Sequence, residues 1–326
     1  MLGFVAPDTV VGIDTPLAPS LPRRPAPKVA TAPATAGWID AAVERGGATI
    51  VSPDRATGLV WTHADDPEGL RTLLADHADI EWVQLPWAGI EPYVPILDRE
   101  RVWTCAKGVY ADPVAEHALA LLLAGLRHLP AYARARSWTE GVGRNLFGAE
   151  VVIYGGGGIA QVLVDLLAPF RCRITVVRRR PVEMPGVARV VAAEDHHDAL
   201  PTADAVVLAL PLVAETEGII GAAELDLLPD HAWIVNVARG RHLRTDELVA
   251  ALRSGTIGGA ALDVTDPEPL PDGHPLWGLP NVLITPHTGN TKAMARPLLG
   301  ARIEENVRRY AAGEPLIGLV DVDLGY

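Results

Sequence analysis

A glycine-rich turn in the middle of the chain constrains the fold more than any other feature of the sequence. Four consecutive glycines follow the apolar run VVIY (151–154) and precede the apolar-periodic segment IAQVLVDLL (159–167). A strand, a tight glycine turn and a helix in this order open a βαβ unit whose helix N-terminus can accept phosphate groups. The pattern G-x-G-x-x-A therefore predicts a dinucleotide-binding fold. The residues expected beside the pyrophosphate are Gly155, Gly157, Gly158 and Ile159.

Short apolar runs alternate with helical segments along most of the chain. Apolar, β-branched strands separated by helices are typical of doubly wound parallel sheets that are buried on both faces. The sequence thus predicts the α/β class, with two Rossmann-like domains. The expected strands are 28–33, 48–51, 58–61, 81–85 and 102–105 in the first part, and 151–154, 173–177, 188–191, 205–210, 233–237, 259–262 and 281–285 in the second.

Length and composition agree with two globular domains. A chain of 326 residues with 49% hydrophobic and 21% charged residues can bury a large core without disulfides or a structural metal. Only two cysteines are present, which favours a reduced, cytoplasmic protein. The proline-rich segment 14–27 is expected to form an extended arm or linker.

The charge and hydropathy patterns exclude several classes of partner. A net charge of −12 argues against nucleic acid and against an anionic membrane surface. The most apolar run, 119–126, is too short to span a bilayer, and the N-terminus lacks the pattern of a signal peptide. An anionic ligand would therefore need basic residues gathered locally at its site.

The end of the strand after the glycine turn bears on the choice of cofactor. An acidic residue about 20 positions after the turn would bond the ribose hydroxyls of NAD. Instead, Arg178 lies 23 positions after Gly155, within a run of three arginines. Because a guanidinium pairs well with a phosphate, Arg178 and Arg179 favour NADP over NAD. The alternative interpretation of this run is a solvated basic turn.

Three candidate catalytic residues each follow an expected strand. They are Arg239 in NVARG, Glu268 in LDVTDPEPLP and His287 in LITPHTGN. The carboxyl ends of parallel strands meet at one edge of a sheet, so the three side chains should lie on the same side as the glycine turn. Taken singly, each residue could be structural or solvated. Together, a cation, a carboxylate and a histidine form a set suited to acid–base chemistry.

Several motifs in order resemble one known family, the D-isomer-specific 2-hydroxyacid dehydrogenases. Besides the glycine turn and the three strand-end motifs, the likeness includes WAGIE (87–91), GVYADPVAEHALALLLAGLR (108–127) and ADAVVLALPLVAETEGII (203–220). The resemblance implies two α/β domains with an interdomain cleft, a homodimer, and hydride transfer between NAD(P)H and a small 2-keto acid or D-2-hydroxy acid. The implied domains are a discontinuous substrate domain, 1–110 plus 291–326 with 1–27 as an arm, and a dinucleotide-binding domain, 111–290.

The resemblance also implies roles for individual residues. Arg239 would bind the substrate carboxylate and polarise the carbonyl. His287 would exchange a proton with the substrate oxygen, and Glu268 would hydrogen-bond His287 and favour its charged form. Substrate contacts are expected at Trp87, Ala88 and Gly89, and further cofactor contacts at Pro211, Val237, Ala238, Asp263 and Gly289.

Other interpretations remain open or are disfavoured. A cofactor-sensing corepressor without turnover is the alternative function, although such a protein would not need all three catalytic candidates. The chain has no Tyr-x-x-x-Lys pair for an epimerase, and Glu268 stands where the related formate dehydrogenases have glutamine. His117 is expected to be structural. His196 and His197 are interpreted as solvated, and no metal site is expected.

Overall fold

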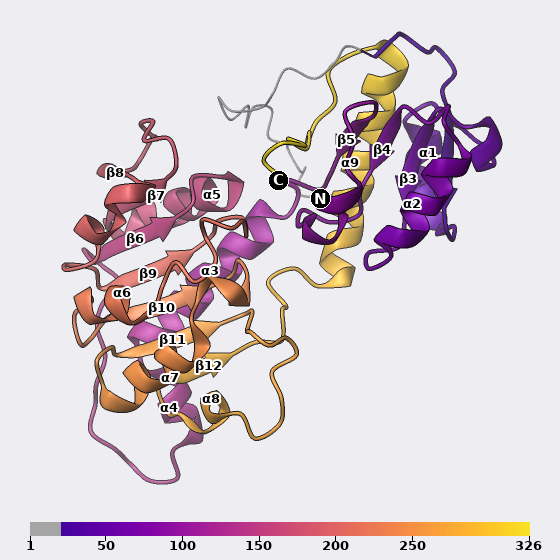
Figure 1. Cartoon of the computed structure of the whole chain (residues 1–326). Coiled ribbons are helices and arrows are strands. Elements are labelled where there is room, and N and C mark those ends of the chain that lie inside the picture. The colour runs from indigo at the N-terminus through magenta and orange to yellow at the C-terminus, as the bar shows by residue number, and fades with distance from the viewer. Residues whose placement is uncertain (1–20) are drawn as a thin grey trace. The chain divides into compact units, whose positions relative to one another are not determined.

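The computed structural model of this chain describes residues 21–326 and contains two compact units (Figure 1). The first unit takes the chain up to Tyr110 and then Lys292–Tyr326, and the second takes Ala111–Thr291. Each unit has its own parallel sheet, which confirms the predicted α/β class with two Rossmann-like sheets. The first half of the expected proline-rich arm, 14–20, lies outside the described residues. Near its end, Arg24 forms a two-pronged ion pair with Glu81, with distances of 2.7 and 2.8 Å.

The first unit has a five-stranded sheet in the order β2-β1-β3-β4-β5. All neighbouring strands in it run parallel. Its strands are β1 (Lys28–Ala32), β2 (Thr49–Ile50), β3 (Gly58–Trp61), β4 (Trp82–Gln84) and β5 (Val102–Thr104). Its helices are α1 (Gly37–Arg45), α2 (Pro67–Asp76) and α9 (Lys292–Ala312), with single 3₁₀ turns at η1 (Pro53–Arg55) and η2 (Glu91–Ile96).

Local sequence explains where these helices start and what they cover. At the start of α2, the Asp66 carboxylate accepts a hydrogen bond from the Gly69 N–H at 2.8 Å, and Pro67 occupies the first helical position. Leu70 and Leu74 of this helix are buried against side chains of the sheet, among them Trp61. A polar cap and a buried apolar stripe thus place α2 on one face of the sheet.

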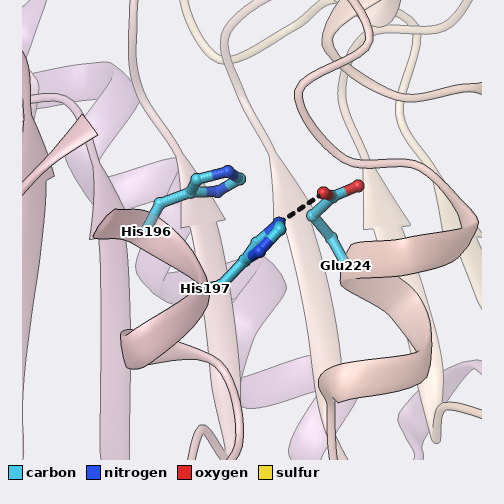
Figure 2. Close-up of side chains that lie close together, drawn as sticks. All are labelled: His196, His197 and Glu224. Atoms are coloured by element: carbon cyan, nitrogen blue, oxygen red, sulfur yellow. Dashed lines mark hydrogen bonds and ion pairs between the residues drawn. The ribbon is translucent and has the colours of Figure 1, made fainter. Parts of the chain in front are cut away.

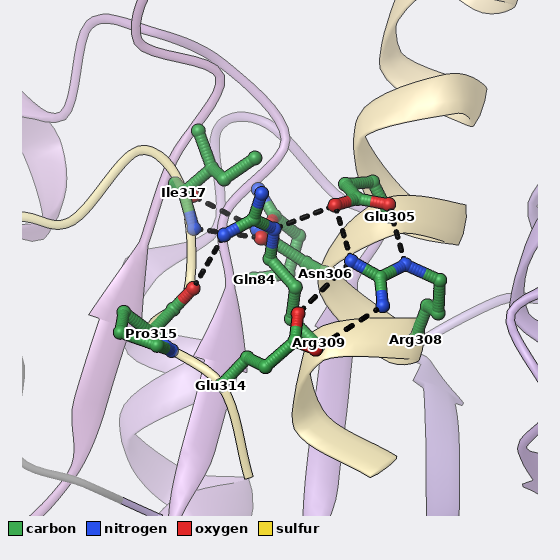
Figure 3. Close-up of polar contacts among 8 residues, drawn as sticks. All are labelled: Gln84, Glu305, Asn306, Arg308, Arg309, Glu314, Pro315 and Ile317. Atoms are coloured by element: carbon green, nitrogen blue, oxygen red, sulfur yellow. Dashed lines mark hydrogen bonds and ion pairs between the residues drawn. The ribbon is translucent and has the colours of Figure 1, made fainter. Parts of the chain in front are cut away.

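A polar network fastens the last helix and the C-terminal segment to the sheet (Figure 3). Asn306 of α9 donates to the Gln84 side chain of β4 at 2.9 Å and exchanges two hydrogen bonds with the Ile317 backbone. Gln84 and Asn306 are fully buried, so their mutual satisfaction avoids a large desolvation cost. On the outer side of α9, Arg308 is the main group that holds the pKa of Glu305 at about 2.

The second unit has a seven-stranded parallel sheet in the order β12-β11-β10-β9-β6-β7-β8. Its strands are β6 (Glu150–Tyr154), β7 (Arg173–Arg178), β8 (Arg189–Ala192), β9 (Ala205–Leu208), β10 (Trp233–Asn236), β11 (Gly259–Leu262) and β12 (Val282–Ile284). Its helices are α3 (Ala111–Leu126), α4 (Leu129–Arg134), α5 (Gly158–Leu167), α6 (Ala222–Leu227), α7 (Thr245–Ser254) and α8 (Pro275–Gly278). The 3₁₀ turns are η3 (Ala168–Phe170), η4 (Ala193–Ala199) and η5 (Gly240–His242).

Alternate residues of β6 show how both faces of this sheet are covered. Val151 and Ile153 pack in a core with apolar side chains of α3 and α5, whereas Val152 and Tyr154 pack in a second core with those of α6 and α7. Successive side chains of the strand therefore point alternately towards two helix layers. Figure 1 shows these layers on either side of the sheet. This arrangement explains why the strands of the second unit are apolar at nearly every position.

The strand order positions the candidate site. From β6 the chain proceeds outwards to β7 and β8, then returns to β9 on the other side of β6. Ligands of doubly wound sheets bind at such a switch point, beyond the carboxyl ends of the strands. The glycine turn follows β6, and Arg239, Glu268 and His287 follow β10, β11 and β12 at the same edge. In the part of the chain that the structure describes, no helix is long and apolar enough to cross a membrane.

Candidate active site

The glycine turn has the geometry that a dinucleotide requires. Gly155 has a φ of 105°, and a Cβ there would lie 2.3 Å from the Ala209 carbonyl oxygen. Gly157 precedes α5, and a Cβ there would meet no heavy atom within 4 Å. Packing therefore explains the glycine at 155, whereas Gly157 faces open space beside a helix N-terminus. Since no protein atom would clash with a side chain at position 157, the glycine there fits close approach of a pyrophosphate to the backbone.

Arg178 ends β7 and lies against this turn. A Cβ on Gly156 would lie 3.0 Å from the Arg178 Nε, so the Arg178 side chain packs against the turn at Gly156. The next residue, Arg179, is exposed. Arg178 thus lies where the ribose end of a dinucleotide is expected, and a guanidinium there fits a cofactor with an extra phosphate.

Arg239 sits in a turn organised by a buried asparagine. The Asn236 side chain donates to the Arg239 carbonyl oxygen at 2.8 Å and accepts from the Ala238 N–H at 3.0 Å. These bonds close the turn immediately after β10, and the Arg239 side chain donates to the Ala238 carbonyl oxygen at 2.7 Å. Asn236 is fully buried, so this turn is held rigidly at the strand end.

Gly240 brings the turn after β10 against the loop after β11. A Cβ on Gly240 would lie 2.0 Å from the carbonyl carbon and oxygen of Thr265. Any larger residue would push these segments apart, and with them Arg239 and Glu268. Thr245 adds a hydrogen bond from its hydroxyl to the Asp266 carbonyl oxygen at 2.8 Å. This close approach of the two backbones explains why glycine follows Arg239.

His287 and Glu268 form the contact that the sequence predicted. The His287 Nδ1 lies 2.7 Å from the Glu268 Oε1, and both side chains are about half exposed, at 53% and 41%. His287 has a φ of 52°, a left-handed conformation that is uncommon for a residue other than glycine. Its backbone N–H donates to the carbonyl oxygens of Asp263 and Thr285. The bond at Nδ1 leaves Nε2 as the ring nitrogen available to a substrate.

Asp263 is buried behind this loop. Its carboxylate accepts hydrogen bonds from the Thr285 hydroxyl at 2.6 Å and from the N–H groups of Thr288 and Gly289 at 2.8 and 2.9 Å. Burial raises the pKa of Asp263, but the hydrogen bonds from His117, Thr285 and the loop outweigh it and hold the pKa far below its ordinary value. A permanently charged Asp263 therefore fixes the loop that carries His287. Its expected contact with a cofactor stays a prediction.

His117 of α3 completes this buried group. Its Nε2 lies 3.0 Å from the Thr285 Oγ1 and 3.2 Å from the Asp263 Oδ1. These contacts give His117 two partners within the protein, and its structural role stays a prediction. Thr285 and Thr288 were not singled out by the sequence analysis, although both flank His287 in the TPHT motif.

His242 is another histidine near the site that the sequence analysis did not identify. It is fully buried at the end of η5, and its Nε2 lies 3.1 Å from the Leu210 carbonyl oxygen. Burial, together with the nearby Arg239 charge, lowers the pKa of His242 to about 4. A neutral histidine therefore joins the turn after β10 to the end of β9, next to the glycine turn.

The remaining predicted residues occupy both units. Val237 and Ala238 are buried after β10, Pro211 is exposed after β9, and Gly289 is buried beside Asp263. Trp87, Ala88 and Gly89 belong to the first unit, where Trp87 packs on Tyr110 with ring centroids 6.0 Å apart. Their contacts with a substrate stay a prediction.

The interpretation of His196 as solvated is wrong. Its side chain is partly buried, and its Nδ1 lies 3.0 Å from the Tyr154 hydroxyl. The polar neighbours in AEDHHD misled the sequence analysis, because the 3₁₀ turn η4 directs His196 towards the sheet. His197 is exposed, as predicted, but pairs with Glu224 at 2.8 Å.

Comparisons with known proteins agree with this geometry. Residues 119–289 match the family model described as the NAD binding domain of the D-isomer specific 2-hydroxyacid dehydrogenases. An uncharacterised protein of Corynebacterium melassecola is 39% identical over 297 residues, which cover 88% of this chain and 95% of that protein. Glyoxylate/hydroxypyruvate reductase A of Salmonella newport is 37% identical over 199 residues, 61% of this chain and 59% of the reductase.

Solved structures resemble the whole fold. A D-isomer specific 2-hydroxyacid dehydrogenase from Xanthobacter autotrophicus Py2, in complex with NADPH and MES, has a TM-score of 0.79 at 28% identity and covers 92% of this chain and 100% of its own. An NADPH-dependent glyoxylate/hydroxypyruvate reductase from Sinorhizobium meliloti, in complex with NADP and sulfate, has a TM-score of 0.77 at 25% identity, with the same coverage.

The predicted family, the enzyme class and a nicotinamide dinucleotide as cofactor are thus confirmed. The family match spans more than half of the 326 residues and includes the glycine turn, Arg239, Glu268 and His287. On that match, and on a fold and strand-end geometry that agree with it, this chain belongs to the D-isomer specific 2-hydroxyacid dehydrogenase family.

Proposed function

We propose that this protein reduces a small 2-keto acid to the corresponding D-2-hydroxy acid with NADPH. The observation that carries the proposal is the 2.7 Å contact between the His287 Nδ1 and the Glu268 Oε1 at the edge of the sheet that also holds the glycine turn. Glyoxylate and hydroxypyruvate are the first substrates to test, since both appear in the names of the reductases from Salmonella newport and Sinorhizobium meliloti.

The two side chains divide the acid–base work. Glu268 would accept a hydrogen bond from the Nδ1–H of His287, so that the proton on Nε2 of the charged imidazole is the one that can reach a substrate oxygen. The buried Asp263 holds the backbone of the same loop, so the direction of the imidazole is set before a substrate arrives. His287 would then donate the Nε2 proton to the carbonyl oxygen during reduction, and would accept it in the reverse direction.

Arg239 supplies the positive charge for the substrate. In a protein with a net charge of −12, a keto acid needs a local cation, and Arg239 stands at the end of β10, two strands from β12 and His287. The planar guanidinium can bind a carboxylate and also polarise the adjacent carbonyl. Binding of the substrate by its carboxylate would fix the keto carbon relative to His287.

The residues that would hold the cofactor are those of the switch point. Backbone N–H groups at the start of α5 would bind the pyrophosphate, and Arg178 and Arg179 would bind the 2′-phosphate of NADP. The bound nicotinamide supplies the hydride that the side chains of this protein cannot provide. His242 would stabilise the neighbouring end of β9 through its hydrogen bond with the Leu210 carbonyl oxygen.

A substrate panel tests the proposal. The purified full-length chain is mixed with NADPH or NADH and with glyoxylate, hydroxypyruvate or longer 2-keto acids, and oxidation of the cofactor is followed by absorbance. We expect turnover with at least one keto acid and none with a ketone that lacks the carboxylate, because Arg239 would have no anion to bind. Tight NADPH binding without turnover of any keto acid would instead favour the cofactor-sensing alternative.

The cofactor preference has its own test at the end of β7. Arg178→Asp should shift the ratio of kcat/KM from NADPH towards NADH by at least about tenfold, since an acid there repels the 2′-phosphate and can bond the ribose hydroxyls. Arg180→Ala, in the same arginine run, is the matched control. An unchanged ratio in Arg178→Asp would show that Arg178 does not determine the choice between NADPH and NADH.

The predicted homodimer and cytoplasmic location are part of the same proposal. Large apolar side chains are exposed around α4 and the segment after it, among them Leu129, Trp138 and Phe147, which supports burial against a second copy. Cys105 and Cys172 are both free, which suits a reducing compartment. Analytical ultracentrifugation should give twice the mass of the 34.6 kDa chain.

A further inference from the structure

Three metal-binding side chains meet outside the candidate active site (Figure 2). His196 and His197 lie on η4, and Glu224 lies on α6, 27 residues further along the chain than His197. One ligand atom from each residue lies within 4.8 Å of the other two, and the His197 Nε2 lies 2.8 Å from the Glu224 Oε1. Figure 2 shows the histidine rings and the carboxylate gathered on one side of η4.

Two of the three side chains are held from behind by a second partner. The Tyr154 hydroxyl lies 3.0 Å from the His196 Nδ1, which leaves Nε2 as the ligating atom. The Glu224 Oε2 accepts a hydrogen bond from the Gly221 N–H at 2.8 Å, which leaves Oε1 towards the histidines. Such outer partners fix the tautomer and the orientation of ligands in protein metal sites. The arrangement is therefore oriented by the fold before any ion binds.

The side-chain types suit a metal ion as well. Imidazoles and carboxylates both coordinate metals, and the three residues supply two of the first and one of the second.

We propose that His196, His197 and Glu224 bind one borderline dication of the Zn²⁺ class, at a place we call the η4–α6 site. Two nitrogen donors and one carboxylate favour Zn²⁺, Co²⁺ or Ni²⁺ over Mg²⁺ or Ca²⁺, which prefer oxygen ligands. Tetrahedral zinc with bonds of about 2.0–2.1 Å needs donor atoms roughly 3.3 Å apart, so only small side-chain movements are required. A water molecule would take the fourth position.

An ion at this site would join two segments that are distant in sequence. The turn η4 follows the edge strand β8, whereas α6 precedes β10 in the interior of the sheet. Bound metal would therefore act as a cross-link within the second unit, close to Tyr154 and thus to the start of the glycine turn. Because only the folded chain presents the three ligands together, zinc should raise the thermal midpoint of unfolding.

Metal titration of the full-length chain tests this site. The protein is freed of its affinity tag and treated with a chelator, and Zn²⁺ is then added in a calorimeter. We expect one equivalent to bind, and Co²⁺ to give the visible absorption of a tetrahedral ion. His196→Ala, His197→Ala and Glu224→Gln should each weaken binding by at least about 10- to 100-fold. Glutamine at 224 can still accept the Gly221 hydrogen bond, so the start of α6 is kept.

His231→Ala is the matched control, because His231 also pairs with a carboxylate of the second unit, Asp204, at 2.9 Å. This variant should bind zinc like the wild-type protein. The absence of stoichiometric binding by the wild-type protein, or equal binding by the wild-type protein and His197→Ala, would overturn the proposal. Cofactor oxidation by metal-free His197→Ala should equal that of the wild-type protein, which shows that the exposed substitution leaves the fold intact.

Discussion

Two of the histidine–carboxylate pairs in the second unit lie at the candidate active site and differ in their exposure. His287 and Glu268 are joined at 2.7 Å, with side chains 53% and 41% exposed. His117 and Asp263 are joined at 3.2 Å, with side chains 20% and 3% exposed. Asp263 and Glu268 are only five residues apart in the loop after β11, so sequence position alone does not separate their roles.

The difference lies in what else each carboxylate binds. Asp263 accepts hydrogen bonds from Thr285, Thr288 and Gly289, so its charge is used within the protein. Glu268 has a weaker second contact, with the Thr265 N–H at 3.4 Å, and the side chain of its partner His287 is half exposed. The buried pair is therefore suited to holding the loop, and the exposed pair to proton transfer. Substitutions in the two pairs should therefore have different effects.

Removing the exposed histidine should have the largest effect. His287→Ala deletes the proton donor, so kcat should fall by about 10²- to 10⁴-fold, whereas the affinity for NADPH should stay within about twofold. Steady-state kinetics and a fluorescence titration with NADPH measure the two quantities. Loss of NADPH binding would assign His287 to the structure of the loop and would remove the contrast with His117.

Removing the buried carboxylate should instead affect stability. Asp263→Ala leaves the Thr285 hydroxyl and two loop N–H groups without their acceptor, which should lower the free energy of unfolding by about 3 kcal/mol or more. The matched substitution Glu268→Ala removes a half-exposed group and should cost less than about 1 kcal/mol. Urea unfolding curves of both variants decide the matter, and equal losses would contradict the comparison.

The buried His242 should make the folding stability depend on pH. Its pKa of about 4 in the folded protein lies below the ordinary value of about 6.5, so the unfolded chain binds more protons between these values. Folding stability should therefore decrease as the pH falls from about 6.5 towards 4, with about 2 kcal/mol lost from this group between pH 7 and 5.

His242→Gln tests this term, because glutamine can keep a hydrogen bond to the Leu210 carbonyl oxygen but does not titrate. The free energy of unfolding of this variant should vary less with pH over that range than that of the wild-type protein. Parallel curves for His242→Gln and the wild-type protein would show that His242 does not titrate in this window.

Much of the fold could be predicted from the sequence because its signals are local. The glycine turn needs only a strand before it and a helix after it, and Gly155 has the positive φ that such a turn requires. All seven expected strands of the second unit are present, with ends that agree to within two residues.

The residues at the ends of β10, β11 and β12 could be named from the sequence for the same reason. Parallel strands place their carboxyl ends on one edge, so a motif after a strand is already a position in space. Only the tertiary structure decided which carboxylate would be buried and which exposed, since His117 reaches Asp263 from α3, far away in the chain. Likewise, His196 and His197 acquired Glu224 and Tyr154 as partners only when the chain folded, because a contact between distant segments depends on packing that no local pattern specifies.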